Sequence, residues 1–138
     1  MKPAMNEFHN LHRTVLIVDD DSNGNQAVAD NLRYRGFNTV SMFSGASALE
    51  YLKKLPVDQL PCAILLDVLM PGMNGCQVLE ELRRSAQTHR IPVIMLSVLS
   101  EDEISEQLAC PCREYNNFIN KPFEMGHIVE VLEKIVHV

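Results

Sequence analysis

The 138-residue sequence lacks several features that would assign it at once to a class of protein. No apolar run approaches the ~18 residues needed to cross a bilayer, and the N-terminus has no apolar signal-peptide core. The chain has no basic stripe or aromatic-rich surface, and its formal net charge of −6 argues against nucleic-acid binding. These absences predict one cytoplasmic domain that binds neither a membrane nor nucleic acid.

The four cysteines do not have the spacing of a metal site. Cys110 and Cys112 are separated by one residue, whereas zinc ligands are usually separated by two to four. Cys62 and Cys76 supply no second close pair. We therefore expect four free thiols in a reducing compartment.

A lone carboxylate at the end of an apolar run is the most informative feature present. Apolar residues 64–66 lead into Asp67, and the turn-forming Pro71 and Gly72 follow shortly afterwards. In open α/β sheets the carboxyl ends of the strands are where ligands bind. Asp67 is therefore a candidate active carboxylate.

A second apolar run, residues 15–18, ends in Asp19, Asp20 and Asp21. If the two strands are parallel neighbours, their acids converge into an oxygen-rich pocket that suits a hard cation such as Mg²⁺. The alternative is that the acidic run only begins a helix, because Asp is favoured at helix N-termini. The residues alone leave both readings open.

Two further strand-like runs end in polar side chains. Residues 92–96 lead into Ser97, and residues 115–120 lead into Lys121. At the same rim, a hydroxyl that donates a hydrogen bond and an ammonium that neutralises charge would suit a phosphoryl group. Taken singly, such a serine is usually a turn or cap residue and such a lysine is usually solvated.

The hydrophobic pattern predicts a strand followed by a helix, repeated five times. This alternation indicates a parallel sheet with helices on both faces. Residues 1–13 are expected to form a flexible N-terminal arm, and residues 14–138 a single domain. Strands are expected near 14–18, 38–42, 62–66, 92–96 and 115–119, and helices near 22–34, 45–54, 75–86, 101–109 and 123–136.

Four motifs follow one another along residues 14–135. They are Val-Asp-Asp at 18–20, Leu-Leu-Asp-x-x-Met-Pro-Gly-Met-Asn-Gly at 65–75, Pro-Val-Ile-Met-Leu-Ser at 92–97 and Asn-Lys-Pro-Phe at 120–123. In this order and spacing the chain resembles a bacterial two-component response-regulator receiver domain of the chemotaxis-regulator type, stand-alone or excised. The resemblance implies a doubly wound (βα)5 flavodoxin-like fold, α/β in class, with a five-stranded parallel sheet of order 2-1-3-4-5.

The resemblance also implies a phosphorylation site. Asp67 would be the phospho-acceptor, and Mg²⁺ would be bound by Asp20, Asp67 and the backbone carbonyl of Leu69. Asp19 would act mainly through a metal-bound water. By the same resemblance, Mg²⁺ is the expected cofactor.

The remaining motif residues would sense and transmit the phosphoryl group. The resemblance implies that Ser97 contacts it, that Lys121 is its cationic partner, and that Ser97 and Phe118 act as switch residues. An ordinary core strand residue remains an alternative for Phe118, because strands favour aromatic residues in any case. Pro122 belongs to a Lys-Pro pair that receivers commonly hold in the cis form.

As a receiver, the protein is expected to accept a phosphoryl group from a histidine kinase or a phosphotransfer domain. It would then signal to an unknown downstream protein through the surface of its fourth helix, fifth strand and fifth helix. Such a domain is not a conventional enzyme, although it assists its own phosphorylation and dephosphorylation. Phosphorylation-dependent homodimerisation is left open.

The sequence departs from the receiver pattern near the expected output surface. Pro111 is expected to cut the fourth helix short, and Glu114 and Tyr115 replace a small pair of residues before the fifth strand. Leu69 and Leu99 occupy the positions that tune hydrolysis, and neither can orient a water molecule. We therefore expect slow self-dephosphorylation. For Val98 two alternatives stay open: its branched side chain narrows access for a phosphodonor or phosphatase, or the site tolerates it.

Three other functions compete with this reading. A pseudo-receiver would act as a docking module without being phosphorylated, and it would be expected to lose some of the acids, the hydroxyl or the lysine. An Asp-nucleophile phosphatase usually carries a second Asp two residues after the first, where this chain has Leu69. In a flavodoxin-like cofactor binder the three clustered acids would repel a phosphate in the absence of a metal, and no Gly-rich phosphate loop follows the first expected strand.

Overall fold

The computed structural model describes residues 13–110 and 112–136. Within these residues strands and helices alternate in the predicted order. The strands are β1 (Thr14–Val18), β2 (Asn38–Met42), β3 (Ala63–Asp67), β4 (Val93–Ser97) and β5 (Asn117–Asn120). The helices are α2 (Ser22–Tyr34), α3 (Gly45–Lys53), α4 (Gly75–Arg84), α5 (Glu101–Leu108) and α6 (Met125–Val136), with a short 3-10 turn, η1 (Val57–Gln59).

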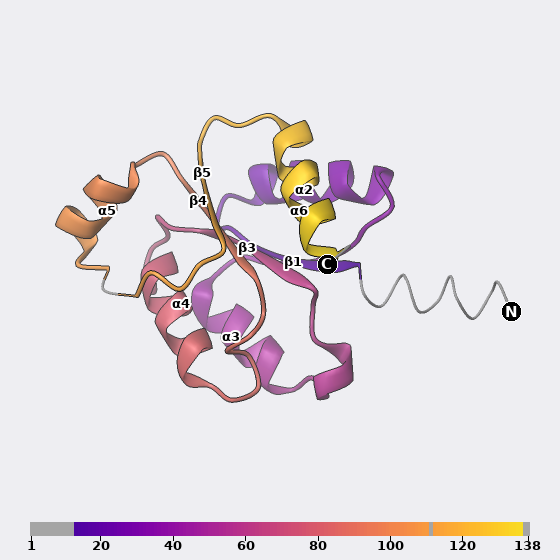
Figure 1. The fold of residues 1–138 in the computed structure, drawn as a ribbon, viewed down its shortest axis with the longest axis horizontal. Helices are drawn as coiled ribbons and strands as arrows, with labels where there is room; N and C mark the ends of the chain where they lie inside the picture. Colours follow the sequence, from indigo (N-terminus) through magenta and orange to yellow (C-terminus); the bar gives the residue numbers. More distant parts are fainter. Residues whose placement is uncertain (1–12, 111, 137–138) are drawn as a thin grey trace, which may run out of the picture.

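The five strands form one parallel sheet in the order β2-β1-β3-β4-β5, as predicted. Helices α2 and α6 cover one face and α3 and α4 cover the other, whereas α5 lies at the periphery (Figure 1). The fold is therefore the doubly wound (βα)5 arrangement. Within the described ranges, no helix is both long enough and apolar enough to cross a bilayer.

Alternation along the strands explains the two layers of core. On β1, Leu16 and Val18 face the core under α3 and α4, while Val15 and Ile17 face the core under α2 and α6. Successive side chains of a strand point to opposite faces, so a strand covered on both sides is apolar throughout. The central strand β3 is buried along its whole length, including Asp67 at its end.

Arg13 is the only residue of the expected N-terminal arm that the structure describes. Its guanidinium lies 2.8 Å from the carboxylate of Glu133 on α6 and 4.2 Å from the ring centre of Phe37. Its Nε also donates to the carbonyl of Gly36, at 3.3 Å. The rest of the expected arm, residues 1–12, lies outside the described residues.

Strand β5 begins two residues later than the sequence pattern suggests. The backbone N–H of Asn116 donates to the carbonyl of Val93, and the side-chain oxygen of Asn116 accepts from the N–H of Val93. A side chain thus takes the place of a backbone acceptor, and regular pairing starts only at Asn117. Helix α5 ends at Leu108, followed by Ala109 in the left-handed conformation with φ 47°; Pro111 lies outside the described residues.

The expectation of four free thiols is wrong for two of them. Cys76 and Cys110 form a disulfide with a Cα–Cα distance of 5.5 Å, and both are buried. The two lie 34 positions apart, and only the fold brings them together, so their spacing gave no signal. Cys62 and Cys112 are free, and burial raises the pKa of the Cys62 thiol to about 11.

Candidate functional site

Three carboxylates meet at the carboxyl edge of the sheet. Asp67 is the last residue of β3, and Asp19 and Asp20 directly follow the neighbouring strand β1. The parallel register pairs Val18 with Leu66, which brings the two strand ends level. Oxygen atoms of the three acids lie within 4.8 Å of one another, so the acids converge as the sequence predicted.

The alternative reading of the acidic run applies to Asp21 alone. Asp21 occupies the N-cap position of α2, but its side chain makes no capping hydrogen bond. Its backbone N–H instead donates to Oδ1 of Asp19, at 3.0 Å. The turn into α2 therefore orients the carboxylate of Asp19 rather than only starting the helix.

Lys121 brings a cation into this cluster from the end of β5. Its Nζ lies 2.7 Å from Oδ1 of Asp67 and 3.4 Å from Oδ2 of Asp19. The backbone N–H of Lys121 donates to the carbonyl of Ser97 at 2.8 Å, which fixes where the side chain starts. The Lys121-Pro122 peptide bond is cis, as the resemblance implied.

Burial and charge act in opposite directions on the two paired groups. Burial raises the pKa of Asp67 to about 6; Lys121 lowers that pKa in part, and Asp19 and Asp20 raise it further. Burial by itself would lower the pKa of Lys121, but the hydrogen bonds and charges of Asp67 and Asp19 outweigh it, and the net change is upward. One ammonium faces three carboxylates, so the pocket has an excess of negative charge.

The donor set fits a small hard cation. Carboxylate oxygens are the ligands that Mg²⁺ prefers, and two oxygens on opposite sides of a bound Mg²⁺ are about 4.2 Å apart. The cluster, whose ligand atoms lie within 4.8 Å of one another, would need little adjustment to bind it. A Cβ at Gly24 would lie 2.9 Å from Oδ2 of Asp21, which is outside the cluster, and at an ordinary contact distance of 3.8 Å from Oδ2 of Asp19.

Ser97 lies at the same rim, at the end of β4, and is almost fully buried. In the register of the sheet it pairs with Asn120, the residue before Lys121. Its hydroxyl oxygen accepts a hydrogen bond from the backbone N–H of Leu99, at 2.9 Å. The side-chain amide of Asn120 donates to the carbonyls of Ser97 and Leu99 and closes this loop from the other side.

The other predicted positions surround the acids without joining them. Phe118 lies on β5, half-buried, with its ring 5.7 Å from that of Tyr115. Leu69, two residues after Asp67, is 39% exposed, and Val98 is 62% exposed. The side chains of Leu69 and Val98 therefore border the rim and are open to solvent.

Two residues that the sequence analysis missed support the acid cluster. Asn25 is fully buried on α2, and its amide nitrogen donates to the carbonyls of Asp19 at 3.1 Å and Met42 at 3.0 Å. Gly75 begins α4 so close to β3 that a Cβ there would lie 2.5 Å from the carbonyl oxygen of Asp67. A polar residue at an inward helical position was a usable signal for Asn25, whereas the close approach at Gly75 appears only in the fold.

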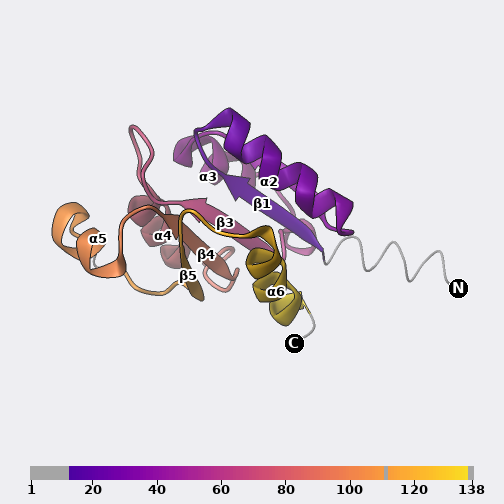
Figure 2. The same cartoon turned by 90° about the horizontal axis from the view of Figure 1, so that it is seen from above.

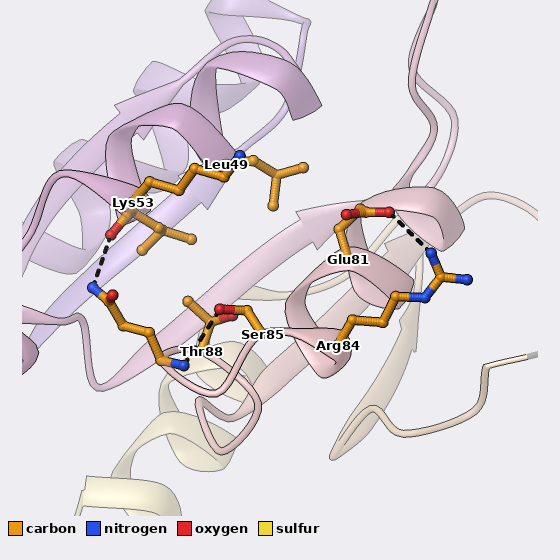
Figure 3. A pocket seen from close by; sticks show the side chains of 8 residues that line it. Leu49, Lys53, Glu81, Arg84, Ser85 and Thr88 are labelled. Carbon is orange, nitrogen blue, oxygen red and sulfur yellow. Dashed lines mark hydrogen bonds and ion pairs between the residues drawn. The ribbon is translucent and has the colours of Figure 1, made fainter.

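A separate hollow of about 250 Å³ lies between α3 and α4 (Figure 3). Several of its polar groups have partners within the protein: the amide of Gln87 donates to the carbonyls of Leu52 and Leu55, and Arg84 pairs with Glu81. It lies at the end of α4, about 15 Å along the helix from the end that contacts Asp67. It is not part of the acidic site.

Comparison with known proteins assigns the class that the fold and the acidic rim suggest. The family model of the response regulator receiver domain matches residues 15–133. Chemotaxis protein CheY-3 of Vibrio cholerae is 33% identical over 132 residues, covering 95% of this chain and 97% of that protein. The chain therefore belongs to the response regulator receiver domain family, a module of two-component signalling.

Other relatives are longer than this chain. The probable transcriptional regulatory protein TcrX of Mycobacterium tuberculosis is 31% identical over 116 residues, which are 84% of this chain and 46% of that protein. The chain thus spans about half the length of the first curated relatives that it matches.

A solved structure of similar length has the same fold. The crystal structure of a putative response regulator from Chloroflexus aurantiacus is 31% identical to this chain with a TM-score of 0.77, covering 92% of this chain and 99% of that one.

Proposed function

We propose that Asp67 accepts a phosphoryl group from a phosphohistidine on a histidine kinase or a phosphotransfer domain. The observation that carries the proposal is the 2.7 Å contact between Lys121 and Asp67 inside a cluster of three carboxylates. The charge of one buried carboxylate could be neutralised by its lysine alone. The two further acids add negative charge that Lys121 does not neutralise, and a bound cation would neutralise it. Membership of the receiver family supports the same assignment.

Each residue of the site has a distinct part in this transfer. The carboxylate of Asp67 attacks phosphorus, the bond from phosphorus to the histidine nitrogen breaks, and the electron pair stays with the imidazole. With a pKa of about 6, Asp67 is mostly ionised at neutral pH and is available as the nucleophile. Lys121 neutralises charge on the transferred oxygens, which is where positioning and electrostatics contribute most in this chemistry.

Asp19, Asp20, Asp67 and the backbone carbonyl of Leu69 are the residues that would hold Mg²⁺, with Asp19 acting mainly through a water. Bound there, the ion would supply positive charge to the phosphoryl oxygens. Asn25 would keep the backbone of Asp19 in place through its hydrogen bond to the Asp19 carbonyl.

The proposed change at the signalling surface begins at Ser97 and its hydrogen-bond partners. Its hydroxyl now accepts from the N–H of Leu99, and we propose that it turns to the phosphoryl group and draws the loop after β4 with it. Phe118 would then turn inward. The surface of α5, β5 and α6 changes its population of conformations, because phosphate favours only the states that it binds better.

The proposal includes the setting of the domain. Residues 1–13 are proposed as an arm and residues 14–138 as the receiver, acting in the cytoplasm on a downstream protein.

The decisive experiment is intact-mass measurement after incubation with acetyl phosphate, with and without Mg²⁺. Wild type is expected to gain one phosphoryl group only with Mg²⁺, and Asp67→Asn is expected to gain none. Asp58→Asn is the matched control, because Asp58 is an exposed acid on η1, and it should behave like wild type. If folded wild type gains no mass, the proposal fails and a docking module becomes the better interpretation.

We predict that the phosphorylated protein loses its phosphoryl group slowly, with a lifetime of many minutes or longer. The apolar side chains of Leu69 and Leu99 cannot orient an attacking water. Leu69→Asn should shorten the lifetime several-fold, while Val57→Asn, at another exposed apolar position, should leave it unchanged. The lifetime is measured by following the mass of the phosphoprotein after removal of acetyl phosphate, and a lifetime of seconds for wild type would contradict the prediction.

A further inference from the structure

The disulfide joins the two elements that flank the acidic site. Cys76 is the second residue of α4, next to Gly75, whose N–H donates to the carbonyl of Val68 beside Asp67. Cys110 follows the C-terminal end of α5, the helix that comes after Ser97. The bond therefore ties the far end of α5 to the helix turn that packs on the end of β3.

Apart from the disulfide, helix α5 makes few buried contacts with the rest of the domain. Ile104 is its only buried residue, and the helix stands away from the other helices in both views (Figures 1 and 2). Tyr115 donates to Glu101 and Arg113 donates to Ser105; Glu101 and Arg113 are exposed, whereas Tyr115 and Ser105 are half-buried. Polar pairs with an exposed partner contribute little to stability, and at the end of α5 only the half-buried Leu108 packs on the core, so the disulfide is the covalent restraint at this end.

Non-covalent contacts restrain the chain again just beyond Cys112. The Nε of Arg83, on α4, donates to the carbonyl of Glu114 at 2.7 Å. Asn116 then pairs with Val93 and leads into β5. Loss of the disulfide would thus free mainly the segment from Val98 to Cys110 and leave β5 in the sheet.

The same cysteine borders the aromatic residues of the output surface. A small hollow of about 10 Å³ under α5 is lined by side chains that include Cys110, Cys112, Tyr115 and Phe118. Release of Cys110 would loosen one wall of this hollow. The space around Phe118, the expected switch aromatic, would change with it.

We propose that Cys76 and Cys110 form a reversible redox tether that sets how far α5 moves when Asp67 is phosphorylated. In the reductive direction a dithiol supplies two electrons and two protons; the sulfur–sulfur bond becomes two thiols and the dithiol becomes a disulfide. In the oxidative direction a disulfide such as oxidised glutathione accepts the two electrons and two protons, and the two thiols form the sulfur–sulfur bond again. Disulfides in reducing compartments are usually transient or redox-sensing, which favours a regulatory bond over a permanent one.

The tether is tested first without phosphorylation. Wild type is oxidised with glutathione disulfide or reduced with dithiothreitol, its thiols are counted by alkylation after denaturation, and amide hydrogen exchange is measured. We expect two thiols in the oxidised protein and four in the reduced protein, with exchange in α5 about tenfold faster after reduction. Exchange in β3 should stay slow in both states.

Variants separate the tether from other thiol effects. Cys76→Ala should show fast exchange in α5 in both redox states, and Cys110→Ala should behave in the same way. Cys112→Ala and Cys62→Ala remove the free thiols and should keep the wild-type response. The proposal is overturned if no bond forms, if native protein resists dithiothreitol, if α5 exchanges equally in both states, or if reduction unfolds β3 as well.

The regulatory part rests on the proposed function and is tested separately. Acetyl phosphate and Mg²⁺ are added to both redox states, and we expect the change in α5 and β5 exchange to be several-fold larger in the reduced protein. If neither state gains phosphoryl mass, the proposed function fails, while the redox difference in α5 still stands on its own measurement. An equal response of both phosphorylated states would overturn the regulation.

Discussion

Helices α4 and α5 begin in the same way and are held in different ways. Each starts with a capping box, formed by Asn74 with Gln77 in α4 and by Ser100 with Glu103 in α5. Yet α4 buries five residues and lies against the backbone of Asp67, whereas α5 buries only Ile104. Local sequence signals make both segments helical, but burial makes α4 part of the rigid frame and leaves α5 able to move.

The difference suits the proposed function, in which the acids bind the phosphoryl group and the surface of α5, β5 and α6 changes conformation. The acids need fixed positions, and α4, β1 and β3 supply them. An output surface needs two conformations of similar free energy, and a helix with one buried residue and one covalent tether is better suited to that.

The largest expected effect comes from truncating one core side chain in each helix. Leu79→Ala in α4 should lower the free energy of unfolding by about 4 kcal/mol, because Leu79 is fully buried. Ile104→Ala in α5 should lower it by less than about 1 kcal/mol, because α5 can detach before the domain unfolds. Urea denaturation measures both, and equal losses would show that α5 is as firmly integrated as α4.

The next effect comes from the disulfide. Reduction should lower the free energy of unfolding by about 3 kcal/mol, because the bond closes a loop between cysteines 34 positions apart and so restricts the unfolded chain. Urea denaturation of wild type with and without dithiothreitol measures the difference. Cys62→Ala should show the same dependence on dithiothreitol, whereas Cys76→Ala should show none.

A smaller effect is expected at the acid against which α4 packs. The pKa of Asp67 in the folded protein, about 6, is higher than the ordinary value of 3.8 for an aspartate, so the folded state binds this proton more tightly. Ionised Asp67 therefore costs stability, the cost develops as the pH rises from about 4 to 6, and it is complete above that range. With EDTA present, Asp67→Asn should be more stable than wild type by about 2 kcal/mol at pH 7 and about equal to it at pH 4.

This comparison is made by urea denaturation at several pH values. Asp58→Asn serves as control, because an exposed acid should give no such pH-dependent difference. A stabilisation by Asp67→Asn that does not change with pH would contradict the assigned cause.

The smallest effect is expected from removing the N-cap side chains of α4 and α5. Asn74→Ala and Ser100→Ala each remove an N-cap hydrogen bond worth about 1 kcal/mol. We expect Asn74→Ala to lower the global free energy of unfolding, and Ser100→Ala to increase amide exchange only within α5. Global destabilisation by both variants to the same extent would remove the distinction between the helices.

Much of the site was predictable because it follows strand ends. Asp67 and Ser97 come at the end of apolar runs, Lys121 follows a strand-like run, and parallel strands bring such ends to one rim. Asn25 and Gly75 were missed because their roles depend on a neighbouring strand. Their contacts are with the backbone of Asp19 and of Asp67 at the strand ends, which the chain reaches only after the turn between strand and helix has formed.

The sequence by itself determined the order of the strands and helices, the two-sided sheet and the acids at its edge, because alternation and apolar periodicity are local properties of the chain. Only the tertiary structure decided which residues distant in the sequence are in contact. It paired Cys76 with Cys110 and left α5 with a single buried residue. Before β5 it also replaced a backbone acceptor by the side-chain oxygen of Asn116, which accepts from the N–H of Val93. These outcomes depend on which surfaces meet after folding, and no local pattern encodes that.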